Sequence, residues 1–111
     1  MKKNFITINT TYPNSKIGKK LLQNLSQFLL EKKLAACIQS QKISSNYLWQ
    51  EKIYYCEEIL VNIKTEAKLY KKIEEIILKN HCFEVPQITV EKINGGLTKY
   101  LSWIAKNTST K

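Results

Sequence analysis

Arginine and aspartate are both absent from this chain, so all 18 basic residues are lysine and all 9 acidic residues are glutamate. Arginine binds phosphates and guanine edges through a planar pair of N–H donors. Without it, we expect neither an enzyme that holds a phosphate with arginine nor a sequence-specific reader of nucleic acid. The net charge of +9 predicts only a weak, salt-sensitive attraction to polyanions. AT-rich coding explains the scattered lysines better than nucleic-acid binding does.

Cysteine and long apolar runs are also scarce. The 3 cysteines, Cys37, Cys56 and Cys82, stand far apart, and no two of them form a C-x-x-C pair. This excludes a disulfide framework and a C-x-x-C metal carrier, and it is typical of a reducing compartment. The apolar stretch at residues 5–8 is broken by a threonine and is too short for a secretory or membrane-spanning segment. We therefore expect a cytoplasmic protein.

The length predicts one domain covering residues 1–111, and an apolar content of 43% suffices for a core. Alternating apolar and polar residues indicate four extended segments. These segments span residues 5–10, 35–49, 53–63 and 85–93, with Gln50 and Glu51 as the turn between the middle two.

Helical spacing of apolar residues predicts three helices, at about 17–33, 69–80 and 97–104. Asn14 or Ser15 is the expected cap of the first helix, and Gly18 weakens its first turn. Thr65 is the expected cap of the second helix, with Glu66 in its first turn. The polar tail at 107–111 is expected to fray.

The predicted order of elements is β-α-β-β-α-β with a closing helix. This is the α+β, ferredoxin-like pattern, with helices on one face of an antiparallel sheet. The two middle strands are longer than a compact domain of this size, because thirteen extended residues span about 43 Å. The hairpin should therefore overhang its own domain and expose Tyr47, Trp49, Tyr54 and Tyr55. Pairing with further copies would cover these rings, so we expect a homo-oligomer.

The only histidine, His81, lies in a corner between the second helix and the last strand, beside Cys82 and Glu84. Pro86 ends any helix there and starts an extended segment. Imidazole, thiol and carboxylate are the groups that bind copper and zinc, so His81 and Glu84 are the leading candidate ligands. A third ligand could come from a neighbouring subunit. The alternative is that His81 caps the preceding helix.

Other side chains have two interpretations each. Cys82 is a candidate soft ligand for copper(I), whereas Cys37, also a candidate ligand, reads better as a small buried hydrophobe. Lys64 could hold an anion at the start of the following helix or remain solvated. The aromatic residues Tyr47, Trp49, Tyr100 and Trp103 could line a ligand cleft, although for Tyr47 and Trp49 a subunit interface is the preferred interpretation.

Five short motifs together resemble the CutA divalent-cation-tolerance family. They are KLAAC at 33–37, YLW at 47–49, IKT at 63–65, HCFEVPQ at 81–87 and YLSWI at 100–104. The resemblance spans nearly the whole chain. It implies a cytoplasmic ferredoxin-like protein that forms homotrimers through the long hairpin and contributes to tolerance of copper and other divalent metals. The candidate metal ligands, named from their side-chain chemistry, are His81, Glu84, Cys37 and Cys82.

The chain departs from the family pattern at several of these positions. Cys82, Phe83 and Gln87 replace a proline, a tyrosine and a glutamate, which removes two polar groups from the expected cleft. Glu51 stands where the family usually has a glycine, which bears on the tightness of the hairpin turn.

Competing functions lack the residues that they require. Acylphosphatases of this fold need an arginine, and an RNA-recognition module needs aromatic residues in a strand such as 88–92, which has none. One histidine cannot serve a full nucleophile–base–acid set, so we expect no catalysis. The alternative to a metal protein is a trimeric platform like the PII signalling proteins, which are relatives by fold. Such a platform would bind a small ligand or a partner in clefts between subunits.

Overall fold

The central strand β1 (Phe5–Pro13) organises the molecule, because its side chains alternate between two environments. Ile6 and Ile8 are buried in the hydrophobic core, whereas Asn9 and Thr11 point to the opposite face of the sheet. The computed structural model describes residues 3–108. In it, β1 continues to Pro13 and does not end at residue 10 as predicted, because β3 is long enough to pair with it there.

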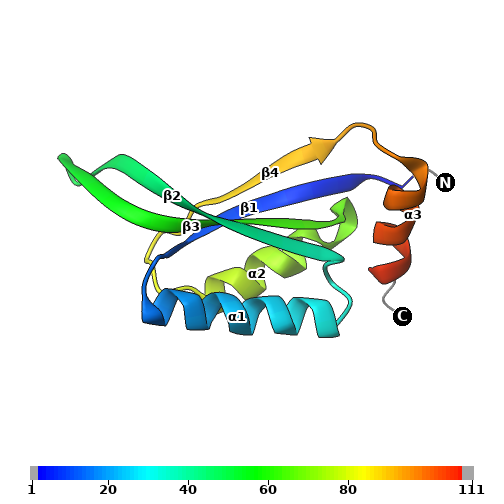
Figure 1. Ribbon diagram of the computed structural model, residues 1–111, viewed down its shortest axis with the longest axis horizontal. Coiled ribbons are helices and arrows are strands. Elements are labelled where there is room, and N and C mark those ends of the chain that lie inside the picture. Colours follow the sequence, from blue (N-terminus) through cyan, green and yellow to red (C-terminus); the bar gives the residue numbers. More distant parts are fainter. Residues whose placement is uncertain (1–2, 109–111) are drawn as a thin grey trace.

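The sheet has four strands in the order β2-β3-β1-β4, and all neighbours are antiparallel. Strand β3 (Lys52–Glu66) lies between β1 and β2 (Cys37–Trp49), and the short β4 (Ile88–Ile93) lies on the other side of β1. Helices α1 (Lys16–Glu31) and α2 (Tyr70–Asn80) cover one face of this sheet (Figure 1). This arrangement confirms the predicted α+β, ferredoxin-like fold.

The core lies between the helices and the sheet. It consists mainly of aliphatic side chains from the sheet and from both helices, together with Tyr12. Its buried members are Ile6, Ile8, Tyr12, Leu25, Leu29, Leu34, Ala35, Ile59, Val61, Ile63, Leu69, Ile73 and Ile77. On the opposite face of the sheet, polar side chains bond across three strands. Asn62 donates to the Asn9 side-chain oxygen (2.5 Å), and Asn9 donates to Glu91 Oε1 (2.9 Å).

The β2–β3 hairpin extends beyond the rest of the sheet, as predicted. Pairing between β1 and β3 stops at Pro13 and Glu58, so residues 44–49 and 52–57 pair only with each other. This overhang makes the described chain 47 Å long but only 26 × 21 Å across (Figure 1). The turn is tight although it contains no glycine: Gln50 and Glu51 both have positive φ, 51° and 66°. This left-handed backbone conformation is strained for residues other than glycine, because they carry a Cβ atom.

Two predictions about the start of the second helix are wrong. Thr65 does not cap a helix: it pairs with Ile6 inside the sheet, and its buried hydroxyl donates to the Leu34 carbonyl (2.6 Å). Glu66 ends the same strand, and the 3₁₀ turn η1 (Ala67–Leu69) separates it from α2. Pairing with β1 therefore outweighed the local capping preference of threonine.

The tail was predicted to fray from residue 107, yet residues 107 and 108 are ordered parts of the fold. Helix α3 (Thr98–Asn107) lies at the end of the molecule opposite the hairpin tip (Figure 1). The Thr108 side chain is fully buried, and its hydroxyl lies 2.8 Å from both Glu66 Oε2 and the Ile104 carbonyl. Residues 109–111 lie outside the described part of the chain.

Gly18 provides a test of the packing between α1 and β1. A Cβ atom at this position would lie 1.9 Å from the Pro13 carbonyl oxygen. We expect Gly18→Ala to lower the free energy of unfolding by about 1–3 kcal/mol through overpacking. Helix propensity alone predicts a gain of about 1 kcal/mol. Urea unfolding distinguishes the two, with the exposed α1 variant Asn24→Ala as the control. A more stable Gly18→Ala protein would contradict the close approach.

Candidate functional site

His81 connects the corner after α2 to the edge of β1. Its Nε2 lies 2.6 Å from the Thr11 carbonyl oxygen, and its Nδ1 accepts a hydrogen bond from the Phe83 N–H (3.0 Å). A carbonyl only accepts and a backbone amide only donates. The ring is therefore the neutral tautomer with its proton on Nε2, and both nitrogens are engaged within the protein.

The position of His81 follows from the length of β4. The last residue of β1 that pairs with β4 is Thr10. Thr11 lies one residue beyond, so the imidazole takes the place of a strand partner for its carbonyl. The ring also stacks on Tyr12, with centroids 4.3 Å apart, and has Phe83 beside it at 5.0 Å. Burial lowers the pKa of His81, and the hydrogen bond to Thr11 and the charge of Glu58 oppose this only in part.

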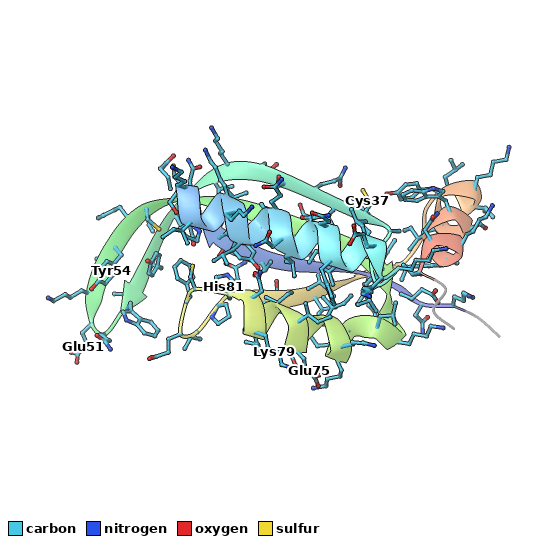
Figure 2. The ribbon with its side chains drawn as sticks, turned by 90° about the horizontal axis from the view of Figure 1, so that it is seen from below. Cys37, Glu51, Tyr54, Glu75, Lys79 and His81 are labelled. Atoms are coloured by element: carbon cyan, nitrogen blue, oxygen red, sulfur yellow. The ribbon has the colours of Figure 1, made fainter. Side chains whose placement is uncertain are left out.

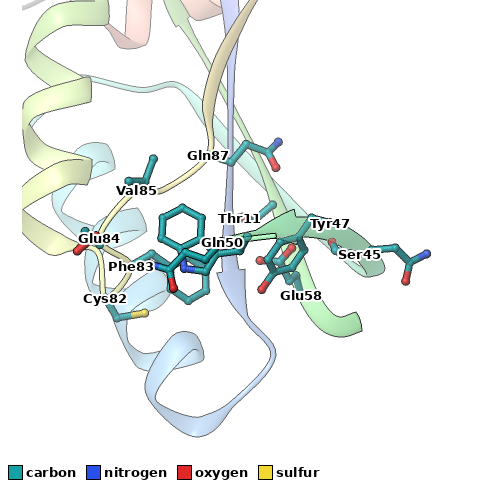
Figure 3. Close-up of a pocket in the computed structure, with 12 residues that line it drawn as sticks. Thr11, Ser45, Tyr47, Gln50, Glu58, Cys82, Phe83, Glu84, Val85 and Gln87 are labelled. Atoms are coloured by element: carbon teal, nitrogen blue, oxygen red, sulfur yellow. The ribbon is translucent and has the colours of Figure 1, made fainter. Parts of the chain in front are cut away.

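A pocket of about 650 Å³ lies between the overhanging hairpin and the loop after His81. Figure 3 shows the loop residues Cys82, Phe83, Glu84 and Val85 across from Tyr47. Its walls combine aromatic rings with hydroxyl, amide, thiol and carboxylate groups. The lining residues are Thr11, Ser45, Asn46, Tyr47, Trp49, Gln50, Glu58, Cys82, Phe83, Glu84, Val85 and Gln87.

Glu58 is a charged lining residue that the sequence did not single out, like Thr11, Ser45 and Asn46 beside it in the pocket. It is only 7% exposed. Among the described residues, its carboxylate forms no hydrogen bond and no ion pair, although other glutamates such as Glu57 and Glu66 have partners. Alternation along β3 places Glu58 on the face opposite the apolar residues. From the sequence pattern alone, that face is predicted to be exposed to solvent. Glu58 pairs with Pro13 on one side and with Ile43 on the other, and the 82–87 loop faces it across the pocket.

The predicted site residues fall into two groups at opposite ends of the sheet. Cys82, Glu84, Tyr47 and Trp49 line the pocket, and the His81 ring packs against its Phe83 wall. The Tyr47 hydroxyl and the Cys56 sulfur also form a weak hydrogen bond, 3.9 Å long. This bond is the main cause that raises the pKa of Tyr47, followed by burial and the charges of Cys56, Glu58 and Tyr54.

The second group lies near α3. Figure 2 shows Cys37 at that end of the molecule, far from Tyr54 at the hairpin. The Tyr100 ring stacks on Trp103, with centroids 5.6 Å apart. The pKa of Tyr100 is raised by burial and by the charge of Cys37 and a hydrogen bond to it. The Lys64 ammonium donates a hydrogen bond to the Gln39 side-chain oxygen, so it has a partner within the protein as well as solvent. Cys37 therefore does not join His81, Cys82 and Glu84 within one chain.

A closed metal site requires three or four ligands held close together. Within residues 3–108, no three His, Cys, Asp or Glu side chains gather closely enough to hold a metal ion. His81 has no free lone pair while it keeps both hydrogen bonds. One chain therefore does not provide the three or four ligands of a closed site.

No helix of the described part is long and apolar enough to cross a membrane.

Together these features define a small ferredoxin-like α+β protein with a ligand-sized pocket beside an overhanging hairpin. The family model for the CutA1 divalent ion tolerance protein matches residues 6–107, and the chain belongs to this family. It is 36% identical over 104 residues to the chloroplastic protein CutA of Arabidopsis thaliana, covering 93% of this chain and 55% of that protein. The chain spans about half the length of the plant relatives it matches, 55% and 56%.

A bacterial relative and a solved structure match over nearly all or all of their lengths. The divalent-cation tolerance protein CutA of Thermotoga maritima is 32% identical over 102 residues, covering 92% of this chain and 97% of that protein. The crystal structure of CutA1 from the psychrotrophic bacterium Shewanella sp. SIB1 has a TM-score of 0.87 and 32% identity. That match covers 99% of this chain and 100% of the Shewanella chain.

The hydrogen bonds of His81 predict how stability depends on pH. Because burial holds the folded-state pKa of His81 below its usual value near 6.5, the unfolded chain binds more protons just below that pH. Stability is then fully present above pH 6.5 and is lost as the pH falls through the folded pKa. We expect the urea midpoint to fall from pH 7 to pH 5, and to fall less in His81→Gln. Since His81 is the only histidine, its NMR ring resonance reports the pKa directly. A pKa at or above 6.5 would contradict the buried, neutral ring.

Proposed function

We propose that this protein contributes to divalent-cation tolerance, above all to copper tolerance, as a cytoplasmic homotrimer that binds without turnover. Membership of the CutA1 family supports the general role. The Arabidopsis relative is named as chloroplastic, so the cytoplasmic location rests on the reducing character of the cysteine pattern. The absence of a free base on His81 supports a binding role over catalysis.

The observation that carries the proposed assembly is the hairpin. Its overhanging part bears apolar side chains on both faces: Leu48, Ile53 and Tyr55 are 72%, 63% and 76% exposed, and Tyr47 and Tyr54 stack on each other across the strands. Exposed apolar strand pairs promote association. Two further copies would cover these faces, and the number of three follows the family resemblance.

Direct metal binding is the finer part of the proposal. Cys82 and Glu84 stand at the pocket, and both are exposed. The ion, copper or another divalent metal, would need further ligands from a neighbouring copy, such as its Cys37, because one chain lacks a closed set. His81 would join only by giving up one of its two hydrogen bonds.

The second candidate function is a trimeric platform, similar in fold to PII proteins, that binds a small ligand in its clefts. A specific observation favours it. The pocket has the volume of a small-molecule site, and it mixes apolar walls with a few polar groups, as such sites do.

Trp49→Ala tests the assembly. If Trp49 anchors the interface, its removal should cost the trimer at least about 2 kcal/mol, as anchor residues do. Sedimentation velocity would then show a smaller species at low concentration. Phe28→Ala is a matched control, since Phe28 on α1 is 43% exposed and Trp49 is 40% exposed. A parent protein that sediments as a monomer would refute the assembly. An unchanged Trp49→Ala profile would refute the role of this ring.

Metal titration tests the direct role. We expect saturable binding of Cu²⁺, and of Zn²⁺ as a metal without redox chemistry, by calorimetry on the reduced protein. Cys82→Ser should weaken binding by at least about tenfold, about 1.4 kcal/mol. Glu75→Gln, an exposed carboxylate on α2, should leave it unchanged. Binding no tighter than about 1 mM in the parent would make any metal role indirect.

A further inference from the structure

We propose that the pocket between the hairpin and the 82–87 loop binds an organic ammonium ion, with Glu58 as its anionic partner. This inference rests on the second candidate function, a ligand site in the cleft, and names the chemical class of that ligand. It does not depend on metal binding by Cys82 and Glu84.

Glu58 carries a charge that has no partner among the described residues. Buried carboxylates in proteins are almost always paired with a cation or with hydrogen-bond donors, since burying a bare charge costs several kcal/mol. The other buried glutamate, Glu66, follows this rule: Thr108 donates to it, and Lys3 Nζ lies 3.7 Å away. Glu58 is 7% exposed and has no such partner among the described residues. Its oxygens are not among the enclosed, unpartnered atoms of the described residues. The carboxylate therefore opens to the pocket, where water or a bound cation can pair with it.

The groups around Glu58 suit an ammonium ion. Phe83 lines the same pocket together with Tyr47, and the faces of aromatic rings attract ammonium groups. An ammonium carries three N–H donors and no acceptor. Ser45 and Gln87, also in the lining, offer oxygen acceptors for the donors that Glu58 leaves free. Figure 3 shows Glu58 close to Tyr47 on the strand side of the pocket.

The size and lining of the pocket suit an organic cation better than a metal ion. The cavity of about 650 Å³ is the size of a small-molecule site, far larger than a bare ion needs. Glu58 belongs to no group of three metal-ligating side chains in the described part. The neighbouring imidazole uses both nitrogens for hydrogen bonds. A single carboxylate with aromatic walls suits an alkylammonium better than it suits a divalent metal.

An ammonium group can come from a free amine or from a lysine of another copy. We commit to the free amine, because the pocket has room for an alkyl chain against Phe83 and Val85. The lysine source makes a different prediction, namely that Glu58 holds the oligomer together.

The experiment titrates the assembled protein with n-butylammonium and, separately, with uncharged 1-butanol, and follows both by amide NMR. We expect n-butylammonium to shift the amides of the 82–87 loop with saturation, and to bind at least tenfold more tightly than 1-butanol. Glu58→Gln, which removes the charge and keeps the size, should weaken n-butylammonium binding at least tenfold. Glu57→Gln is the matched control, since Glu57 is the adjacent, exposed carboxylate on the other face of β3.

Three results would overturn the proposal. The first is no saturable binding of n-butylammonium to the parent protein. The second is equal binding to the parent and to Glu58→Gln. The third is dissociation of the oligomer in Glu58→Gln, which would assign the cation to a lysine of another copy.

A second variant keeps the proposal testable if Glu58→Gln does not fold. Phe83→Leu retains an apolar wall but removes a ring, so it should weaken n-butylammonium binding and leave 1-butanol binding unchanged. Equal losses for both probes would overturn the role of the ring.

A copper titration of Glu58→Gln separates this inference from the metal proposal. Unchanged copper binding together with lost n-butylammonium binding would support two separate ligands. Lost copper binding would make Glu58 a metal ligand and overturn the ammonium assignment.

Discussion

The unequal lengths of the strands determine most of what this protein can do. β2 and β3 have 13 and 15 residues, whereas β1 has 9 and β4 has 6. Because antiparallel strands pair residue by residue, the longer pair must continue past the end of the shorter ones. The result is a ribbon with two exposed apolar faces at one end of a closed core. Both the proposed assembly and the pocket depend on this overhang.

The short β4 has an equally direct consequence. Where β4 ends, a backbone carbonyl of β1 is left without a strand partner, and buried carbonyls rarely remain unpaired. The imidazole of His81 fills that gap and at the same time holds the start of the 82–87 loop through the Phe83 amide. The loop is thereby fixed beside the hairpin, and the pocket forms between them. His81, the only histidine of the chain, therefore supports the wall of the pocket and does not line the pocket itself.

Much of the fold followed from the residue pattern. Period-two alternation predicted the strands, including the long hairpin, and apolar spacing predicted all three helices. The errors occurred where tertiary contacts outweighed local preference. Thr65 has the side chain of a helix cap, but nine consecutive pairs between β1 and β3 hold it in the sheet. Thr108 stands in a polar tail, but the buried carboxylate of Glu66 requires its hydroxyl. Neither partner is close in sequence, so no local pattern could show it.

The sequence by itself determined the fold class, the overhanging hairpin and the group of polar residues around His81, because these depend on periodicity and on neighbours along the chain. Only the tertiary structure decided which of these groups meet. It separated Cys37 from Cys82 by placing them at opposite ends of the sheet, and it engaged both nitrogens of His81. It also enclosed Glu58, which alternation alone assigned to an open face. Burial and pairing depend on segments distant in sequence, and they arise only when the chain folds.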